Sequence, residues 1–309
     1  MIRVLTESHT LERNNMPTQP LWQQQKQAIE SELQERITKF KANVKRRKAM
    51  QPLFAAGVQP LTLMAQGDSW FDYPLPFPTH SDVIAHLNAM PISPEILSLA
   101  HHGEAAEDMM GVSKYERLKA ALMDNSTGQQ FDAILFSGGG NDLAGDQFAL
   151  WLKDAARVAN NPAQGLDQEM LSAIMQVVTG SYRRLIALRD AVQASYAPGS
   201  KLPLFVHSYD FAIPTGIGVC TAGPWLQPGL TERGWDTPNG TTIVRQMLTA
   251  FATALDQLAT QTPDFIHVHT QGTLTAPQWA NELHPTPEGF AAISAQFVQA
   301  LRTRFPGRI

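Results

Sequence analysis

The sequence of 309 residues has very little cysteine and no long apolar run. Cys220 is its only cysteine, so no disulfide can form within the chain, which fits a reducing compartment. Because Cys220 lies in a Gly/Pro-rich stretch without a nucleophile motif, we interpret it as a structural thiol. No apolar stretch approaches the roughly 20 residues of a transmembrane helix. Residues 1–20 also lack the apolar core of a secretory signal, so we expect a cytoplasmic protein without a membrane span.

Charge is also scarce. Charged residues make up 17% of the chain, and the formal net charge is -4. Since no basic surplus is available for the phosphates of nucleic acid or for anionic lipid headgroups, neither is an expected partner. The hydrophobic share of 43% and the length are ordinary for a globular protein with one large domain and room for an appendage.

The chain opens with a polar tail, residues 1–20, which we expect to be disordered or loosely attached. Residues 21–50 then predict one long helix, because apolar residues recur on a single face. These residues are Trp22, Ile29, Leu33, Ile37, Phe40 and Val44. The helix ends in four cations, residues 45–48, which we interpret as a solvated last turn that suits the helix dipole. We expect it to be an appended packing element.

Over residues 55–309, short apolar runs alternate with amphipathic segments. Five strands are expected over residues 61–66, 96–100, 132–137, 202–207 and 265–269. Helices are expected over residues 104–123, after Asp142, over 166–194 and 241–260, and from Pro287 onward with Thr286 as N-cap. This alternation predicts an α/β domain with a five-stranded parallel sheet between two helical layers. Such sheets form their sites at the carboxyl ends of the strands.

Polar motifs stand at these positions. Gly67-Asp68-Ser69-Trp70 follows the first strand, His102-Gly103 the second, and Gly138-Gly139-Gly140-Asn141-Asp142 the third. Asn281-Glu282-Leu283-His284-Pro285 precedes the last helix. In this order, over about residues 60–305, the serine, glycine, asparagine and histidine resemble the blocks of the SGNH (GDSL-type) hydrolase family. The resemblance implies a flavodoxin-like three-layer α/β/α sandwich.

The resemblance also implies a set of catalytic roles. Ser69 would be the nucleophile and His284 the general base. The oxyanion hole would consist of the backbone N–H groups of Ser69 and Gly103 and the side-chain amide of Asn141. Glycine allows close approach of the backbone, and an asparagine amide donates without titrating. Asp68 is expected to have a structural role in the turn.

One residue departs from the family pattern. The family usually has an aspartate three residues before the histidine, where this chain has Asn281. In the serine-protease triad an equivalent change lowers turnover about ten-thousandfold, because it favours the wrong imidazole tautomer. Three possibilities follow: the Asn281 oxygen or a backbone carbonyl orients His284, Glu282 takes the role, or the protein is catalytically weak or inactive.

Other candidates carry less specific signals. His207-Ser208-Tyr209-Asp210 ends the fourth strand, which makes His207, Tyr209 and Asp210 candidates for substrate contact, with a structural role as the alternative. The His101/His102 and His267/His269 pairs could bind a metal, but no carboxylate or cysteine cluster completes either pair. We therefore expect ordinary histidines and no metal or cofactor. Residues 211–240 are interpreted as a wall or lid over the site, with a plain surface loop as the alternative.

These observations favour a serine hydrolase that cleaves a carboxylic ester with a small acyl group, so the expected partner is a small-molecule ester. An acyltransferase would use the same residues. The alternative from another class is a non-catalytic binding module, which Asn281 makes credible. Neither the oligomeric state nor the alcohol part of the substrate follows from the sequence.

Overall fold

The computed structural model describes residues 20–50, 59–75, 81–127, 130–195, 202–219 and 222–309. Five parallel strands form one sheet in the order β2-β1-β3-β4-β5. The strands are β1 Thr62–Gly67, β2 Glu95–Ser98, β3 Ala133–Ser137, β4 Leu204–His207 and β5 Phe265–Val268. Their side chains are largely buried on both faces, as in a sheet covered by two helical layers.

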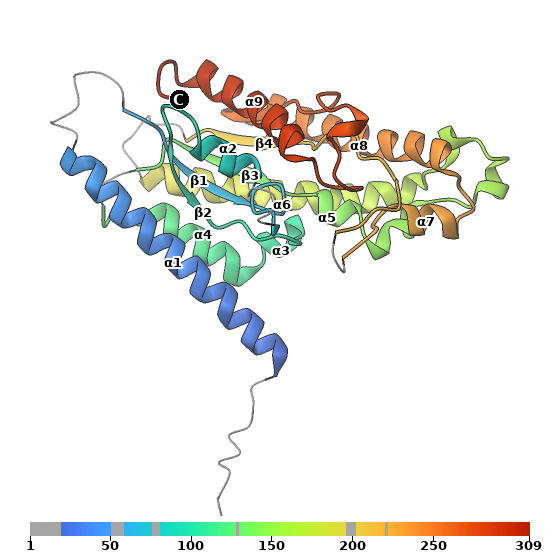
Figure 1. Ribbon diagram of the computed structural model, residues 1–309, viewed down its shortest axis with the longest axis horizontal. Coiled ribbons are helices and arrows are strands. Elements are labelled where there is room, and N and C mark those ends of the chain that lie inside the picture. The colour runs from blue at the N-terminus through green and yellow to red at the C-terminus, as the bar shows by residue number, and fades with distance from the viewer. Residues whose placement is uncertain (1–19, 51–58, 76–80, 128–129, 196–201, 220–221) are drawn as a thin grey trace, which may run out of the picture.

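The helices cover the sheet from both sides (Figure 1). Their bounds are α1 Leu21–Met50, α2 Val83–Asn88, α3 Ala106–Met109, α4 Val112–Met123, α5 Gly140–Leu143, α6 Gln168–Ser195, α7 Gln227–Glu232, α8 Thr237–Gln261 and α9 Pro287–Arg304. Helices α2 and α9 pack together on one face, whereas α4, α6 and α8 pack in sequence on the other. The predicted three-layer α/β/α fold is therefore confirmed.

Strand order also places the site. β1 lies between β2 and β3, so the chain leaves β1 toward one edge of the sheet and later returns across it. The crevice beyond the carboxyl ends of β1 and β3 is the topological switch point, where doubly wound sheets bind their ligands. Ser69 follows β1 and Asn141 follows β3, so the fold brings both residues to this crevice.

The sequence expectation was wrong for some helices. The helix expected over 104–123 is broken into α3 and α4 at Gly111, which takes an extended conformation as N-cap of α4. After Asp142 the chain forms only the end of α5 and then the 3-10 helices Asp146–Trp151, Ala155–Val158 and Pro162–Gln164. Helix α2 was not expected. The predicted caps of α9 are present: Thr286 accepts from the backbone N–H of Gly289, and Pro287 opens the helix.

Helix α1 packs along the edge strand β2 (Figure 1). Its buried residues are Leu33, Phe40 and Val44, and Phe40 stacks on Phe131 with ring centroids 5.5 Å apart. Its basic end is not merely solvated, because Arg47 donates to the carbonyl of Ser93 and Lys48 to that of Thr127. The appended helix is thus fastened by apolar and polar contacts.

Two sequence interpretations lie outside the described residues: the disordered tail, except for its last residue, and the structural role of Cys220. The division into a tail, an appended helix and a domain over 55–309 stays a prediction. Among the described helices, none combines the length and apolar character needed to cross a bilayer.

We predict that Phe40→Ala lowers the free energy of unfolding by about 3 kcal/mol, because it removes a buried ring and leaves a cavity beneath α1. Urea unfolding monitored by circular dichroism measures this loss. The exposed neighbour Lys39 provides the control, since Lys39→Ala is expected to change the value by no more than about 0.5 kcal/mol. Equal stabilities of the two variants would contradict the packing described for α1.

Candidate active site

Ser69 lies on the turn that leaves β1. The turn is closed by the carbonyl of Asp68, which accepts from the backbone N–H groups of Phe71 and Asp72. The Asp68 carboxylate points into the protein and accepts from the N–H of Trp70 and the hydroxyls of Ser137 and Tyr209. Burial raises the pKa of Asp68 to about 6, although these hydrogen bonds act in the opposite direction. Asp68 thus holds the turn and does not contact His284 directly.

His284 reaches Ser69 from the loop before α9. Its Nε2 lies 2.7 Å from Ser69 Oγ, although 215 positions separate the two residues in the chain. Trp70 helps to hold this loop, because its indole N–H donates to the carbonyl of Leu283 at 3.0 Å. Both Ser69 and His284 are more than nine-tenths buried. The pair has the separation that a nucleophile and its general base require.

Asn281 orients the imidazole from the other side. Its side-chain oxygen lies 2.9 Å from His284 Nδ1, and it also accepts from the backbone N–H groups of Leu283 and His284 at 3.1 and 3.0 Å. Only an oxygen can accept these two backbone hydrogen bonds, so the amide cannot be turned around. His284 Nδ1 must then carry the proton, which leaves the Nε2 lone pair directed at Ser69. Asn281 therefore fixes the tautomer that a general base needs.

The second possibility, that Glu282 replaces the missing acid, is wrong. The carboxylate of Glu282 is fully buried and accepts from four backbone N–H groups that lie in another segment. One oxygen accepts from Gly216 and Gln227, the other from Trp225 and Leu226. Glu282 thus fastens Gly216 and residues 225–227 to the loop that carries His284. The ring of Trp225 packs edge-on against His284 at 5.5 Å between centroids.

The electrostatics of His284 differ from those of a triad with an acid. Its pKa is lowered to about 3, mainly because burial disfavours the imidazolium, with a smaller contribution from the charge of His102. Asn281 is neutral and does not offset this penalty. The imidazole is therefore a neutral, weakly basic group through the whole physiological pH range.

The three residues expected to supply the oxyanion donors follow three neighbouring strands: Ser69 follows β1, Gly103 follows β2 and Asn141 follows β3. Gly103 follows β2 with a φ of 77°, in the left-handed region that favours glycine. Gly139 also has a left-handed φ, 109°, and a Cβ there would lie 2.8 Å from Phe251, so this position too requires glycine.

The turn at Gly139 leads to Asn141, whose side-chain amide donates one N–H to the carbonyl of Glu104 at 2.9 Å. No described residue accepts its second N–H. Within the described residues, the N–H groups of Ser69 and Gly103 have no intramolecular acceptor.

The three residues at the end of β4 have different environments. His207 is fully buried, donates to Ser137 and accepts from the N–H of Tyr209, so its ring does not line the crevice. Tyr209 borders the pocket beside Ser69, but its hydroxyl is occupied by Asp68. Asp210 also borders it, and its carboxylate accepts from the N–H groups of Phe211, Gly272 and Leu274.

A pocket of about 40 Å³ opens beside Ser69 and Asn141. The rest of its lining is mainly apolar: Trp70, Leu143, Ala144, Ala212, Leu226, Val244, Met247, Leu248, Trp279 and Leu283. The segment expected to form a wall thus contributes Ala212 and Leu226. Its second tryptophan, Trp235, instead packs away from the pocket and donates to the carbonyl of Lys153.

No protein-family model matches the sequence, and no curated protein matches it either. Solved structures do match. A lipase from a goat rumen metagenome is 13% identical, with 78% of this chain and 97% of that chain covered and a TM-score of 0.50. A carbohydrate acetylesterase family member from Sinorhizobium meliloti is also 13% identical, with coverage of 79% and 98% and a TM-score of 0.47.

A catalytic mutant of an acetylxylan esterase from Geobacillus stearothermophilus is again 13% identical, with coverage of 79% and 95% and a TM-score of 0.44. At these identities the likeness concerns the fold. The chain has the α/β/α fold of the rumen lipase.

Sequence reasoning missed the role of Glu282 because its partners lie 55 to 66 positions away. The available signals were a carboxylate inside a motif and, in a distant part of the sequence, a long Gly/Pro-rich segment whose backbone N–H groups needed acceptors.

We predict that Asn281→Asp moves the acid limb of the kcat/KM profile upward by about one pH unit or more, because a carboxylate beside Nδ1 stabilises the imidazolium. The same change preserves or raises kcat/KM at pH 8, since a more basic His284 takes the Ser69 proton more readily. Rates with p-nitrophenyl acetate from pH 2.5 to 9 measure both effects, because this range includes the acid limb that a His284 pKa of about 3 predicts for the wild type. The matched control is Asn125→Asp on an exposed loop. Acid limbs that coincide in the wild type, Asn281→Asp and Asn125→Asp would contradict the assignment of His284 as the general base.

We predict that Glu282→Gln lowers the free energy of unfolding by at least about 2 kcal/mol, because an NH₂ group replaces one acceptor and leaves two buried N–H groups unpaired. It should also lower kcat/KM, because the backbone N–H groups of Trp225 and Leu226 lose their hydrogen-bond acceptor. Urea unfolding and ester hydrolysis measure the two losses. Glu232→Gln on the exposed side of α7 is the control; a Glu282 variant as stable and active as this control would refute the role of Glu282.

Proposed function

We propose that the protein is a serine hydrolase that cleaves a carboxylic ester through an acyl-enzyme on Ser69. The observation that carries this proposal is the hydrogen-bonded series Ser69 Oγ, His284 Nε2, His284 Nδ1 and Asn281 Oδ1, with separations of 2.7 and 2.9 Å at its two ends. A serine with only a structural role does not need a histidine hydrogen-bonded to its hydroxyl. A histidine without a catalytic role does not need a neighbour that fixes its tautomer.

The first half of the reaction forms the acyl-enzyme. Ser69 Oγ attacks the ester carbonyl while His284 Nε2 accepts its proton. The negative charge that develops on the carbonyl oxygen is stabilised by the N–H groups of Ser69, Gly103 and Asn141. His284 then gives the proton to the departing alcohol. In the second half, His284 Nε2 takes a proton from a water that attacks the acyl group. The imidazolium then gives this proton to Ser69 Oγ as the bond between Ser69 and the acyl group breaks.

Asn281 acts throughout as a neutral acceptor. It holds Nδ1–H in place and stabilises the transient imidazolium less than a carboxylate would. Its advantage is that His284 stays neutral in acidic solution, where an acid-assisted histidine becomes protonated. The low pKa of His284 thus supports an esterase that retains its base well below pH 7.

The pocket indicates the substrate class. Its small volume and apolar lining favour a short acyl group, with the alcohol part directed outward past Ser69. The same acyl-enzyme would serve an acyltransferase if an alcohol replaced water in the second half. We propose a small-molecule ester as substrate, and cytoplasmic residence stays a prediction.

We predict that Ser69→Ala lowers the hydrolysis of p-nitrophenyl acetate at least about 1,000-fold, because the attacking oxygen is lost. Ser113→Ala, on the exposed side of α4, should keep full activity. A fluorophosphonate probe should label the wild-type protein and Ser113→Ala but not Ser69→Ala. Equal turnover and equal labelling of Ser69→Ala and the wild type would exclude this site, and absence of labelling in all three proteins would favour a non-catalytic binding module.

A further inference from the structure

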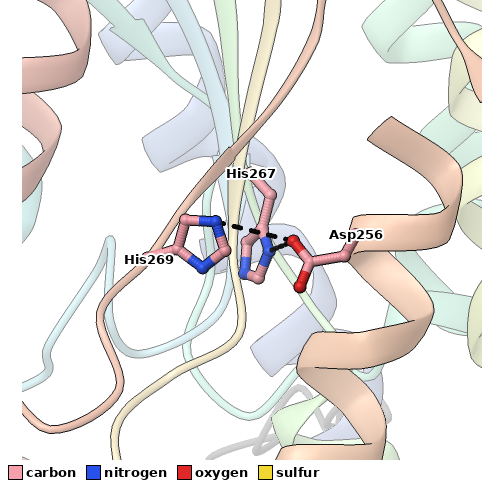
Figure 2. A group of neighbouring side chains, drawn as sticks. All are labelled: Asp256, His267 and His269. Carbon is pink, nitrogen blue, oxygen red and sulfur yellow. Dashed lines mark hydrogen bonds and ion pairs between the residues drawn. The ribbon is translucent and has the colours of Figure 1, made fainter. Parts of the chain in front are cut away.

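A second cluster of polar side chains lies where β5 faces α8. His267 and His269 alternate along the end of β5 and point to the same side, and Asp256 projects toward them from α8 (Figure 2). Asp256 Oδ1 lies 2.7 Å from His267 Nδ1 and 3.5 Å from His269 Nε2. Two imidazole nitrogens thus converge on one carboxylate oxygen.

We propose that Asp256, His267 and His269 bind one divalent transition-metal ion, for which Zn²⁺ is the best match. Imidazole nitrogen and carboxylate oxygen are ligands of choice for this class of ion, and three protein ligands leave a fourth position for water. The sequence suggested the two histidines as a possible pair of ligands but not the carboxylate, because Asp256 comes from a helix and lies 11 positions before the first histidine.

The separations fit a tetrahedral ion. Metal bonds of 2.0–2.1 Å place neighbouring ligand atoms about 3.3 Å apart. The contact of 3.5 Å between His269 and Asp256 already matches this value, and the candidate ligand atoms of the cluster all lie within 4.8 Å of one another. The contact of 2.7 Å between His267 and Asp256 must widen by about half an ångström. Asp256 can provide this shift, because its side chain is 51% exposed.

A buried serine prepares His267 for this role. His267 Nε2 lies 2.9 Å from Ser208 Oγ, and Ser208 is fully buried at the end of β4. When Nε2–H donates to this hydroxyl, the lone pair of Nδ1 points at the proposed ion. Metal-bound histidines almost always have such an outer hydrogen bond, which fixes the tautomer and the ring orientation. The support is part of the fold and does not depend on solvent.

The ion has a path to the site and a structural effect once bound. The His269 side chain is 70% exposed, so the ion can enter from solvent. The bound ion would link α8 to β5, just before residues 270–274, which Asp210 holds by two hydrogen bonds. We assign it no step in ester hydrolysis, so the site stands independently of the proposed function.

The test is a titration of the full-length chain with ZnCl₂ after removal of metal by a chelator and dialysis. Calorimetry should give one ion per chain, and thermal unfolding should show a higher Tm when Zn²⁺ is present. His269→Ala and Asp256→Ala should each weaken binding at least about tenfold and remove the Tm shift. Both positions are exposed, so these variants are expected to fold. Gln257→Ala, an exposed neighbour on α8, should behave as the wild type.

Two results would overturn the proposal. One is the absence of stoichiometric Zn²⁺ binding by the wild-type chain. The other is unchanged affinity and an unchanged Tm shift in His269→Ala, which would place the ion on histidines elsewhere in the chain.

Discussion

The geometry of the candidate active site depends on one oxygen atom, Oδ1 of Asn281. It accepts hydrogen bonds from two backbone N–H groups and from the Nδ1–H of His284. The backbone bonds determine which end of the amide faces the ring, and the ring then has only one neutral tautomer that satisfies both Asn281 and Ser69. In a serine protease whose aspartate is replaced by asparagine the amide favours the wrong tautomer. Here the two backbone N–H groups that bind the Asn281 oxygen prevent the wrong tautomer, and no charged group is needed.

The lack of charge has consequences for the rest of the site. With a neutral partner at Nδ1, nothing offsets the effect of burial on His284, and its pKa falls to about 3, with a smaller contribution from the charge of His102. The nearby carboxylates of Asp68 and Glu282 have structural roles. Asp68 holds the turn of Ser69 through Ser137 and Tyr209. Glu282 holds the wall of the pocket through four N–H groups. Each buried carboxylate is paired with hydrogen-bond donors, so burial costs less than it would for an isolated charge.

The sequence predicted the sheet and its polar motifs well, because both are local signals. Apolar runs marked the five strands within about two residues, and Ser69, Asn141 and His284 stood at the ends of elements that a parallel sheet brings together. Contacts between distant segments could not be predicted. The break at Gly111 depends on backbone conformation, the orientation of Asn281 depends on the turn before α9, and Asp256 meets His267 only when α8 packs on β5. Periodicity and motif spacing contain none of this information.

The most direct test of this account is the protonation state of His284, measured by nitrogen NMR of the histidine-labelled protein and assigned with a His284→Gln variant. The account predicts a neutral ring between pH 5 and 8, with the proton on Nδ1 and an unprotonated Nε2 facing Ser69. A ring with its proton on Nε2, or an imidazolium at pH 5, would contradict the role given to Asn281.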